Sequence, residues 1–214
     1  MDIQNLKEQL RCPKGDLAKH VGDIMNESNK HMIAKCIDKI DFKGNERILE
    51  IGQGNGKHVH DLLQNHKSLS YEGIEISAEM YNESIENNTD YIENDRTVFR
   101  LYDGLILPYM NDSFDIILTI NTIYFWEDAK SFLTEITRVV SPQGSIYITF
   151  LHKETTENQT FLDDEFQHYS YDTFLELVDS CGLVMRSYVL KKECAINKKG
   201  QYIDRYYGIY QLAL

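Results

Sequence analysis

The stretch Arg47-Ile48-Leu49-Glu50-Ile51-Gly52-Gln53-Gly54-Asn55-Gly56-Lys57 joins a short apolar strand, a carboxylate and three alternating glycines. Glycine reaches backbone angles that a Cβ forbids, and it lets a ligand lie against the main chain. A helix that follows such a turn begins with free N–H groups. A dinucleotide fingerprint reads G-x-G-x-x-G, whereas this chain reads G-x-G-x-G and has Lys57 where the third glycine would stand. The pattern predicts a nucleotide-cofactor loop of a different kind.

The segment from Glu50 to Gly56 resembles the first motif of the class I S-adenosylmethionine-dependent methyltransferases, of the small, bacterial, methyltransferase-11-like kind. The resemblance runs from about residue 44 to residue 151. It implies S-adenosyl-L-methionine as the cofactor, with Glu50, Gly52, Gln53 and Gly54 in its binding site. The alternative for these glycines is a tight strand-to-helix turn that binds nothing.

Strand-like runs alternate with helical patterns along the chain, which is typical of a doubly wound, mostly parallel sheet. The predicted strands are 48–51, 71–76, 97–101, 115–120 and 145–151. The runs 183–190 and 205–212 have no helix between them and therefore predict a C-terminal antiparallel hairpin, joined by the polar stretch 191–201. The resemblance implies seven strands in this Rossmann-like α/β fold. The turn Ser141-Pro142-Gln143-Gly144 is expected before the fifth strand.

Two further acids stand where predicted strands end. Glu75 follows Gly56 by nineteen residues, close to the spacing of an acid that binds ribose hydroxyls, and a carboxylate offers two acceptor oxygens to such a diol. Ile76 adjoins it. The resemblance assigns Asp103 to the adenine amino group, with the backbone of Gly104 beside the ring. A solvent-facing Glu75 and an Asp-Gly turn without a ligand are the alternatives.

The segment after the fourth predicted strand is expected to border the methyl acceptor, because ligands in open α/β sheets lie beyond the carboxyl ends of strands. Asn121 is predicted to contact the cofactor. Asn121 and Tyr124 share the spacing of an Asn-Pro-Pro-Tyr motif, but Thr and Ile replace its prolines, so no catalytic role is carried over. Tyr124 and Trp126 are expected to form an aromatic wall near the sulfonium, with core packing as the alternative for Trp126.

Residues 1–43 are predicted to form an N-terminal helical segment ahead of a cofactor-binding domain at 44–214. Apolar residues recur at helical spacing from Met25 to Ile40, and Gly44 is the expected stop. In related methyltransferases such a segment covers the cofactor, so Asn26 and Asn29 are candidate polar contacts, with Asn29 also assigned to the substrate pocket. Packing of the helix on the sheet is the alternative.

The composition of the chain argues against some classes of binding partner. The net charge of −12 disfavours nucleic acid, whose backbone is bound largely by Lys and Arg. No apolar run reaches the roughly 18 residues of a membrane span, and the first residues lack the pattern of a signal peptide. We therefore expect a cytoplasmic protein without a membrane partner. The four cysteines show no metal-ligand spacing. The same holds for five histidines that are expected at surface or helix-cap positions: His58, His60, His66, His152 and His168.

These observations predict a transferase that moves a methyl group from S-adenosylmethionine to a small-molecule acceptor by in-line displacement. An NAD(P)-dependent oxidoreductase and a noncatalytic S-adenosylmethionine-binding protein are the alternatives. Acidic and aromatic residues at 161–171 mildly favour an uncharged or cationic acceptor. Asp163, Asp164 and Glu165 can equally form a solvated turn.

Overall fold

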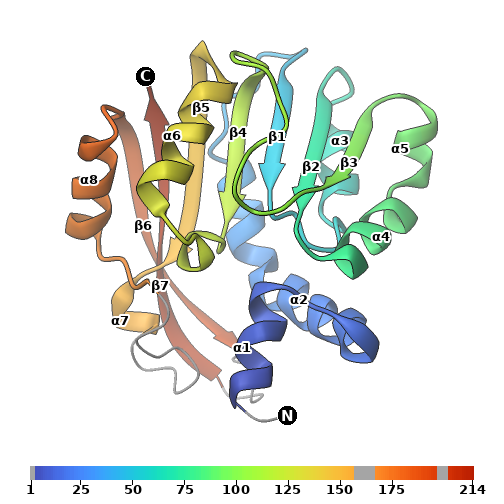
Figure 1. Cartoon of the computed structure of the whole chain (residues 1–214), viewed down its shortest axis with the longest axis horizontal. Coiled ribbons are helices and arrows are strands. Elements are labelled where there is room, and N and C mark those ends of the chain that lie inside the picture. Colours follow the sequence, from blue (N-terminus) through green and yellow to red (C-terminus); the bar gives the residue numbers. More distant parts are fainter. Residues whose placement is uncertain (1–2, 157–166, 197–201) are drawn as a thin grey trace.

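The computed structural model describes residues 3–156, 167–196 and 202–214. A mixed sheet forms its centre, with helices on both faces (Figure 1). The strands are β1 (Arg47–Ile51), β2 (Ser70–Glu75), β3 (Thr97–Leu101), β4 (Phe114–Ile120), β5 (Val140–Leu151), β6 (Val184–Ile196) and β7 (Tyr202–Ala213). The α-helices are α1 (Ile3–Arg11), α2 (Ala18–Ile37), α3 (Val59–Asn65), α4 (Ala78–Asn87), α5 (Thr89–Glu93), α6 (Ala129–Val139), α7 (Lys153–Thr156) and α8 (Tyr171–Ser180). The 3-10 helices are η1 (Gly15–Leu17) and η2 (Ile123–Phe125).

The strand order is β3-β2-β1-β4-β5-β7-β6. Strands β1 to β5 pair in parallel, whereas β7 is antiparallel to both β5 and β6. The predicted doubly wound sheet with a C-terminal antiparallel hairpin is confirmed. The order reverses direction at β1, and β4 lies on its other side. This is the switch point at which open α/β sheets bind ligands.

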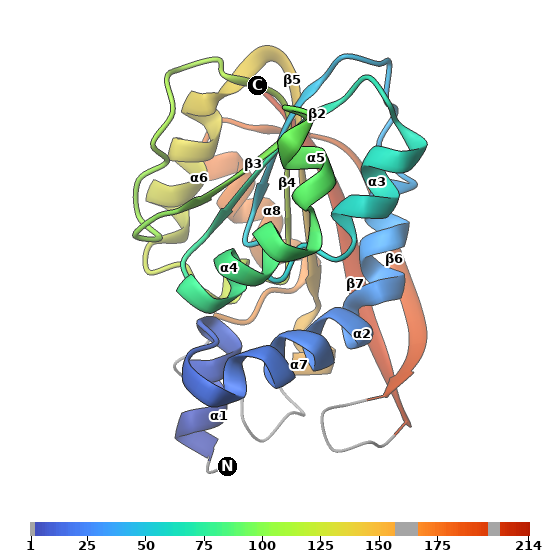
Figure 2. The same ribbon diagram turned by 90° about the vertical axis from the view of Figure 1, so that its right-hand side faces the viewer.

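Alternating side chains of the central strands build two cores. On β1, Leu49 and Ile51 face the core covered by α6 and α8, whereas Ile48 faces the core covered by α2 and α3. Strand side chains alternate between faces with a period of two, so two adjacent buried residues serve opposite layers. Figure 2 shows α2 and α3 on one side of the sheet and α6 on the other. Burial on both faces explains the continuous apolar runs in these strands.

Several predicted boundaries were wrong, and three of them by the widest margins. The helix before the sheet ends at Ile37, well before Gly44, and closes with a turn in which the Ile40 N–H donates to the Ile37 carbonyl. Strand β5 begins at Val140, because a bulge in the β4–β5 pairing takes up the expected turn at 141–144. Strand β6 continues to Ile196, and polar residues pair across the hairpin, as in the ion pair of Lys192 with Asp204. Residues 197–201 of the predicted linker lie outside the described part of the chain.

The N-terminal helices lie at the end of the sheet to which β1 points (Figure 1). Leu10 of α1 packs with Val21 and Met25 of α2 and with Phe125 of η2. The C-terminal half of α2 belongs to the sheet core instead, where Met32 and Cys36 are fully buried. One helix therefore both packs on the sheet and reaches over the carboxyl ends of its strands.

Candidate functional site

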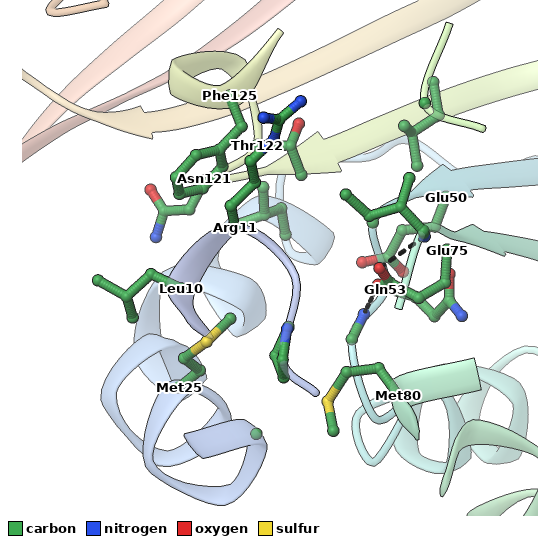
Figure 3. A pocket seen from close by; sticks show the side chains of 18 of the residues that line it. Leu10, Arg11, Met25, Glu50, Gln53, Glu75, Met80, Asn121, Thr122 and Phe125 are labelled. Carbon is green, nitrogen blue, oxygen red and sulfur yellow. Dashed lines mark hydrogen bonds between the residues drawn. The ribbon is translucent and has the colours of Figure 1, made fainter. Parts of the chain in front are cut away.

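A pocket lies between the carboxyl ends of the parallel strands and the N-terminal helices. Its lining comes from α1, α2, the β1–α3 turn, the ends of β2, β3 and β4, and η2 with the residues that follow it. Figure 3 shows Glu75, Gln53 and Met80 on one side of this pocket and Leu10, Arg11, Met25 and Phe125 on the other. Of the predicted site residues, those in its lining are Asn26, Asn29, Glu50, Gly52, Gln53, Gly54, Glu75, Ile76, Asp103, Gly104, Asn121 and Trp126.

The glycine turn forms the floor of the pocket. Gly52 and Gly54 have φ of +74° and +58°, in the left-handed region that favours glycine. A Cβ on Gly52 would come within 2.5 Å of the Thr122 side chain, whereas a Cβ on Gly54 would project into open space. Gly54 itself lines the pocket. The turn therefore offers bare main chain to a ligand.

Glu75 ties the end of β2 to the glycine turn. Its Oε2 accepts from the Gly54 N–H at 3.0 Å, and its Oε1 accepts from the N–H groups of Ile76 and Ser77 at 2.8 and 3.0 Å. Burial raises the pKa of the Glu75 carboxyl, and the three amide hydrogen bonds lower it only in part. The carboxylate is thus held in one orientation, and its remaining lone pairs can accept from ligand hydroxyls. The alternative of a solvent-facing Glu75 was wrong, because the residue is only 6% exposed.

Glu50 and His58 form a buried pair beside the turn. The Oε2 atom of Glu50 lies 2.8 Å from His58 Nε2 and accepts from the Tyr71 hydroxyl at 2.7 Å. Burial by itself lowers the pKa of His58, but the charge and hydrogen bond of Glu50 and the charge of Asp61 raise it overall. His58 occupies the cap position before α3, which the sequence allowed, but its side chain makes no capping hydrogen bond and turns inward to Glu50 instead.

Gln53 differs from the other turn residues. Its side chain is buried, and its Nε2 contacts the hydroxyl of Ser84 at 3.5 Å, a long hydrogen bond. Its Oε1 has no hydrogen-bond partner among the described residues. A Cβ on Gly73 would touch this side chain within 3 Å, so Gln53 fills the space under β2. The contribution of Gln53 to a ligand is therefore expected from its main chain.

Asp103 and Gly104 lie at the end of β3. The Oδ1 atom of Asp103 accepts from the N–H groups of Leu105 and Ile106, and these bonds hold the pKa of Asp103 below its usual range. Gly104 has φ of +83°, and its Cβ would meet Ile76 at 3.2 Å. Asp103 and Gly104 form a turn and also line the pocket, and the contact with adenine stays a prediction. Asp103 is exposed and ionised, so it presents an acceptor at this end of the pocket.

Amide side chains connect α2 to both walls of the pocket. Asn26 Nδ2 donates to Asn55 Oδ1 of the glycine turn at 3.3 Å, and Asn121 Nδ2 donates to Asn29 Oδ1 at 3.0 Å. Asn121 has φ of +58°, which is uncommon for a residue with a side chain and often accompanies a binding site. Asn26 and Asn29, for which the sequence indicated no partner, thus connect α2 to segments far away in the chain.

Tyr124 was expected in the substrate pocket, but it is not part of the pocket lining. It is 7% exposed, and its hydroxyl lies within hydrogen-bonding distance of two acceptors, Asn121 Oδ1 at 3.0 Å and the Leu151 carbonyl at 3.2 Å. Phe125 and Trp126 line the pocket instead. A single 3-10 turn sends neighbouring side chains in different directions, and only packing decides which one enters the pocket. Trp126 is also packed against Phe132 with ring centroids 4.9 Å apart, as the core-packing alternative expected, and its place near the sulfonium stays a prediction.

Sequence reasoning missed the contribution of α1 and of the residue after Trp126. Leu10, Arg11 and Glu127 all line the pocket, and Arg11 Nη2 lies 3.4 Å from Glu127 Oε1. No spacing links positions 116 residues apart. The apolar face of α1 was the signal that could have been followed, since Leu6 and Leu10 both pack with α2.

The described ranges contain neither a metal cluster nor a membrane span. In these ranges no group of three or more His, Cys, Asp or Glu residues could hold a metal ion. The four cysteines are free. No helix in the described part of the chain is long and apolar enough to cross a membrane.

The fold and the site together define a class of protein. A sheet of order β3-β2-β1-β4-β5-β7-β6 with a glycine turn after β1 and acids at the ends of β2 and β3 is a Rossmann-like cofactor-binding domain. Residues 49–148 match the family of methyltransferase domains. The chain belongs to the class I S-adenosylmethionine-dependent methyltransferases. Of the cofactors weighed from the sequence, S-adenosyl-L-methionine is therefore the one that this family uses.

Individual relatives agree with this assignment. The chain is 30% identical over 150 residues to "Putative methyltransferase YrhH" of Bacillus subtilis (strain 168), covering 68% of this chain and 81% of that protein. It is 26% identical over 126 residues to methyltransferase GfsG of Streptomyces halstedii, covering 59% of this chain but only 45% of GfsG. The crystal structure of an Aquifex aeolicus SAM-dependent methyltransferase shares the fold with a TM-score of 0.65 and 17% identity over 100% of both chains.

Proposed function

We propose that this protein transfers the methyl group of S-adenosylmethionine to a small-molecule acceptor that binds between α1, α2 and η2. The observation that carries the proposal is the extent of the pocket, which continues from Glu75 and Asp103 past Asn121 to Phe125 and Trp126. Such a pocket has one end for the cofactor and another for the acceptor. The proposal includes three expectations from the sequence. The enzyme is cytoplasmic, it has one cofactor-binding domain, and its N-terminal segment covers the cofactor.

The residues at the strand ends fit the cofactor chemically. Glu75 would accept from the ribose hydroxyls, and Asp103 with the backbone of Gly104 would meet the adenine. The bare main chain at Gly52 and Gly54 would border the methionine portion, because the space in front of Gly54 is what a Cβ would fill. Ile76 and Met80 add apolar surface beside these groups.

When bound, the cofactor supplies an electrophilic methyl group on a sulfonium. The chain's own part is to hold and orient. The hydrogen bonds of Asn26 with Asn55 and of Asn29 with Asn121 hold α2 against both walls. Positioning alone can supply much of the rate enhancement, with effective molarities of order 10⁵ M or more. No dedicated base is required when the acceptor atom is already nucleophilic.

Calorimetry tests the cofactor half of the proposal. S-adenosylmethionine and S-adenosylhomocysteine should bind the folded protein with one site, and NADH should not displace them. Absence of binding up to millimolar ligand would reject the proposal, and displacement by NADH would favour an oxidoreductase.

Turnover tests the catalytic half. Release of S-adenosylhomocysteine, followed across a panel of small-molecule acceptors, should identify at least one substrate. Cofactor binding without any turnover would favour the noncatalytic alternative.

A further inference from the structure

The acceptor end of the pocket has an apolar wall. Leu10 and Trp126 are buried, and they lie in the pocket lining with Met25 and Phe125. Trp126 is held by its edge contact with Phe132, and Phe125 has a similar contact with Tyr124. Figure 3 shows Leu10, Met25 and Phe125 on the same side of the pocket. This wall fits an apolar molecular body.

One ion pair crosses the mouth of the pocket beside this wall. Arg11 of α1 and Glu127 after η2 approach to 3.4 Å, and their side chains are 50% and 66% exposed. Both residues line the pocket. An exposed pair of this length is weak, so a ligand group can replace either partner. We refer to Arg11 and Glu127 as the mouth pair.

The other charged groups of the pocket are held by the protein itself. Glu50 is bonded to His58 and Tyr71. Glu75 and Asp103 accept from backbone N–H groups. Within the described lining, Arg11 is therefore the one Lys or Arg side chain available to a ligand.

We propose that the acceptor is an amphipathic carboxylate, whose anionic group binds Arg11 in place of Glu127 while its apolar body lies on the wall formed by Leu10, Met25, Phe125 and Trp126. This inference rests on the proposed methyl transfer and adds the acceptor class. Arginine suits this role because its planar donors match the two oxygens of a carboxylate. Glu127 then acts as a built-in competitor that occupies Arg11 until the acceptor arrives. The proposal reverses the preference drawn from 161–171, of which 161–166 lie outside the described residues.

The test uses two sets of probes that share a body and differ in charge. Decanoate, decanamide and decylamine form one set, and 3-phenylpropanoate with 3-phenylpropanamide forms the other. Each is titrated calorimetrically into protein saturated with S-adenosylhomocysteine, after the affinity for S-adenosylhomocysteine has been measured alone. In at least one set the acid should bind about tenfold or more tightly than its amide, and decylamine should bind no better than decanamide.

The mouth pair gives variants with opposite expected effects. Arg11→Ala should weaken the preferred acid about tenfold or more and leave its amide unchanged. Glu127→Gln should strengthen the same acid about two- to fivefold, because the competing carboxylate is gone. Arg100→Ala is the matched control, since Arg100 also pairs with a glutamate, is also 50% exposed and lies outside the pocket lining. It should change neither value.

The inference would be overturned by acids that bind no better than amides, by tighter binding of the amine, or by no binding of either acid. Loss of acid binding in Glu127→Gln would also overturn it. A wild-type protein that fails to bind S-adenosylhomocysteine contradicts the proposed function itself. Normal S-adenosylhomocysteine binding without acid preference contradicts only the acceptor class.

Discussion

Glu75→Gln separates a cofactor ligand from a structural carboxylate. Glu75 is buried and accepts from the N–H groups of Gly54, Ile76 and Ser77. Hydrogen bonds to a charged group contribute about 1.5–3 kcal/mol, so loss of the charge toward the ribose hydroxyls should weaken S-adenosylhomocysteine binding roughly 10- to 150-fold. The amide side chain has nearly the same volume and keeps one carbonyl oxygen. Packing of the β2 end should therefore persist.

The stability of the ligand-free protein should respond differently. The glutamine side chain of the variant loses the hydrogen bond from Gly54, which costs about 1 kcal/mol, but the substitution also removes a buried charge. Because burial outweighs the amide bonds, the folded-state pKa of Glu75 lies above its unfolded value. The favourable contribution of this carboxyl is then fully present below the unfolded pKa of about 4.3 and is lost as pH rises through the raised folded pKa. Opposed effects should leave the free energy of unfolding at pH 7 within about 1 kcal/mol of wild type.

Two measurements check this combination. Calorimetry gives the affinity for S-adenosylhomocysteine, and urea unfolding from pH 4 to pH 8 gives stability. Wild type should lose stability relative to Glu75→Gln as pH rises through the folded-state pKa. Glu72→Gln is the control, because Glu72 lies on the same strand, pairs with Arg100 at 3.1 Å and is outside the pocket lining. Unchanged binding in Glu75→Gln would refute the ribose assignment, and a large loss of stability would mean that its charge mainly supports the fold.

Three further changes probe the site and its supports. Gly54→Val should abolish measurable S-adenosylhomocysteine binding in calorimetry and destabilise the fold by about 1–2 kcal/mol. The φ of +58° at this position disfavours a Cβ, and a side chain here would also occupy the ligand space. Normal binding would mean that the turn is misread. His58→Gln should make the free energy of unfolding, measured in urea, depend less on pH above pH 6. The pKa of His58 is raised beside Glu50, so its contribution to stability is present below the unfolded-state pKa of about 6.5 and is lost as pH rises through the folded-state pKa. An unchanged pH dependence would contradict this. Arg205→Ala should lower the free energy of unfolding by about 3–5 kcal/mol, because Arg205 forms a buried pair with a glutamate and donates to the Ser28 carbonyl. Lys192→Ala removes an exposed ion pair and should cost less than about 1 kcal/mol. Equal losses would refute this distinction between buried and exposed pairs.

Features that depend on short stretches of chain could be predicted from the amino-acid sequence. The apolar runs, the glycine turn and the acids at 75 and 103 all lie within a few residues of the strands that carry them. In a parallel sheet the carboxyl ends of neighbouring strands meet at one edge, so these residues gather without further information. The absence of a helix between the last two strands likewise predicted the hairpin.

The side chains that complete the pocket depend on contacts between residues distant in the chain and could not be predicted. Arg11 and Glu127 meet across 116 residues, and the direction in which Tyr124, Phe125 and His58 point depends on what surrounds them. Tyr124 turns away because its hydroxyl finds partners near β5, and His58 turns inward because Glu50 is buried beside it. Local sequence sets backbone conformation, whereas side-chain direction at a turn is set by packing and by hydrogen bonds to residues distant in the chain.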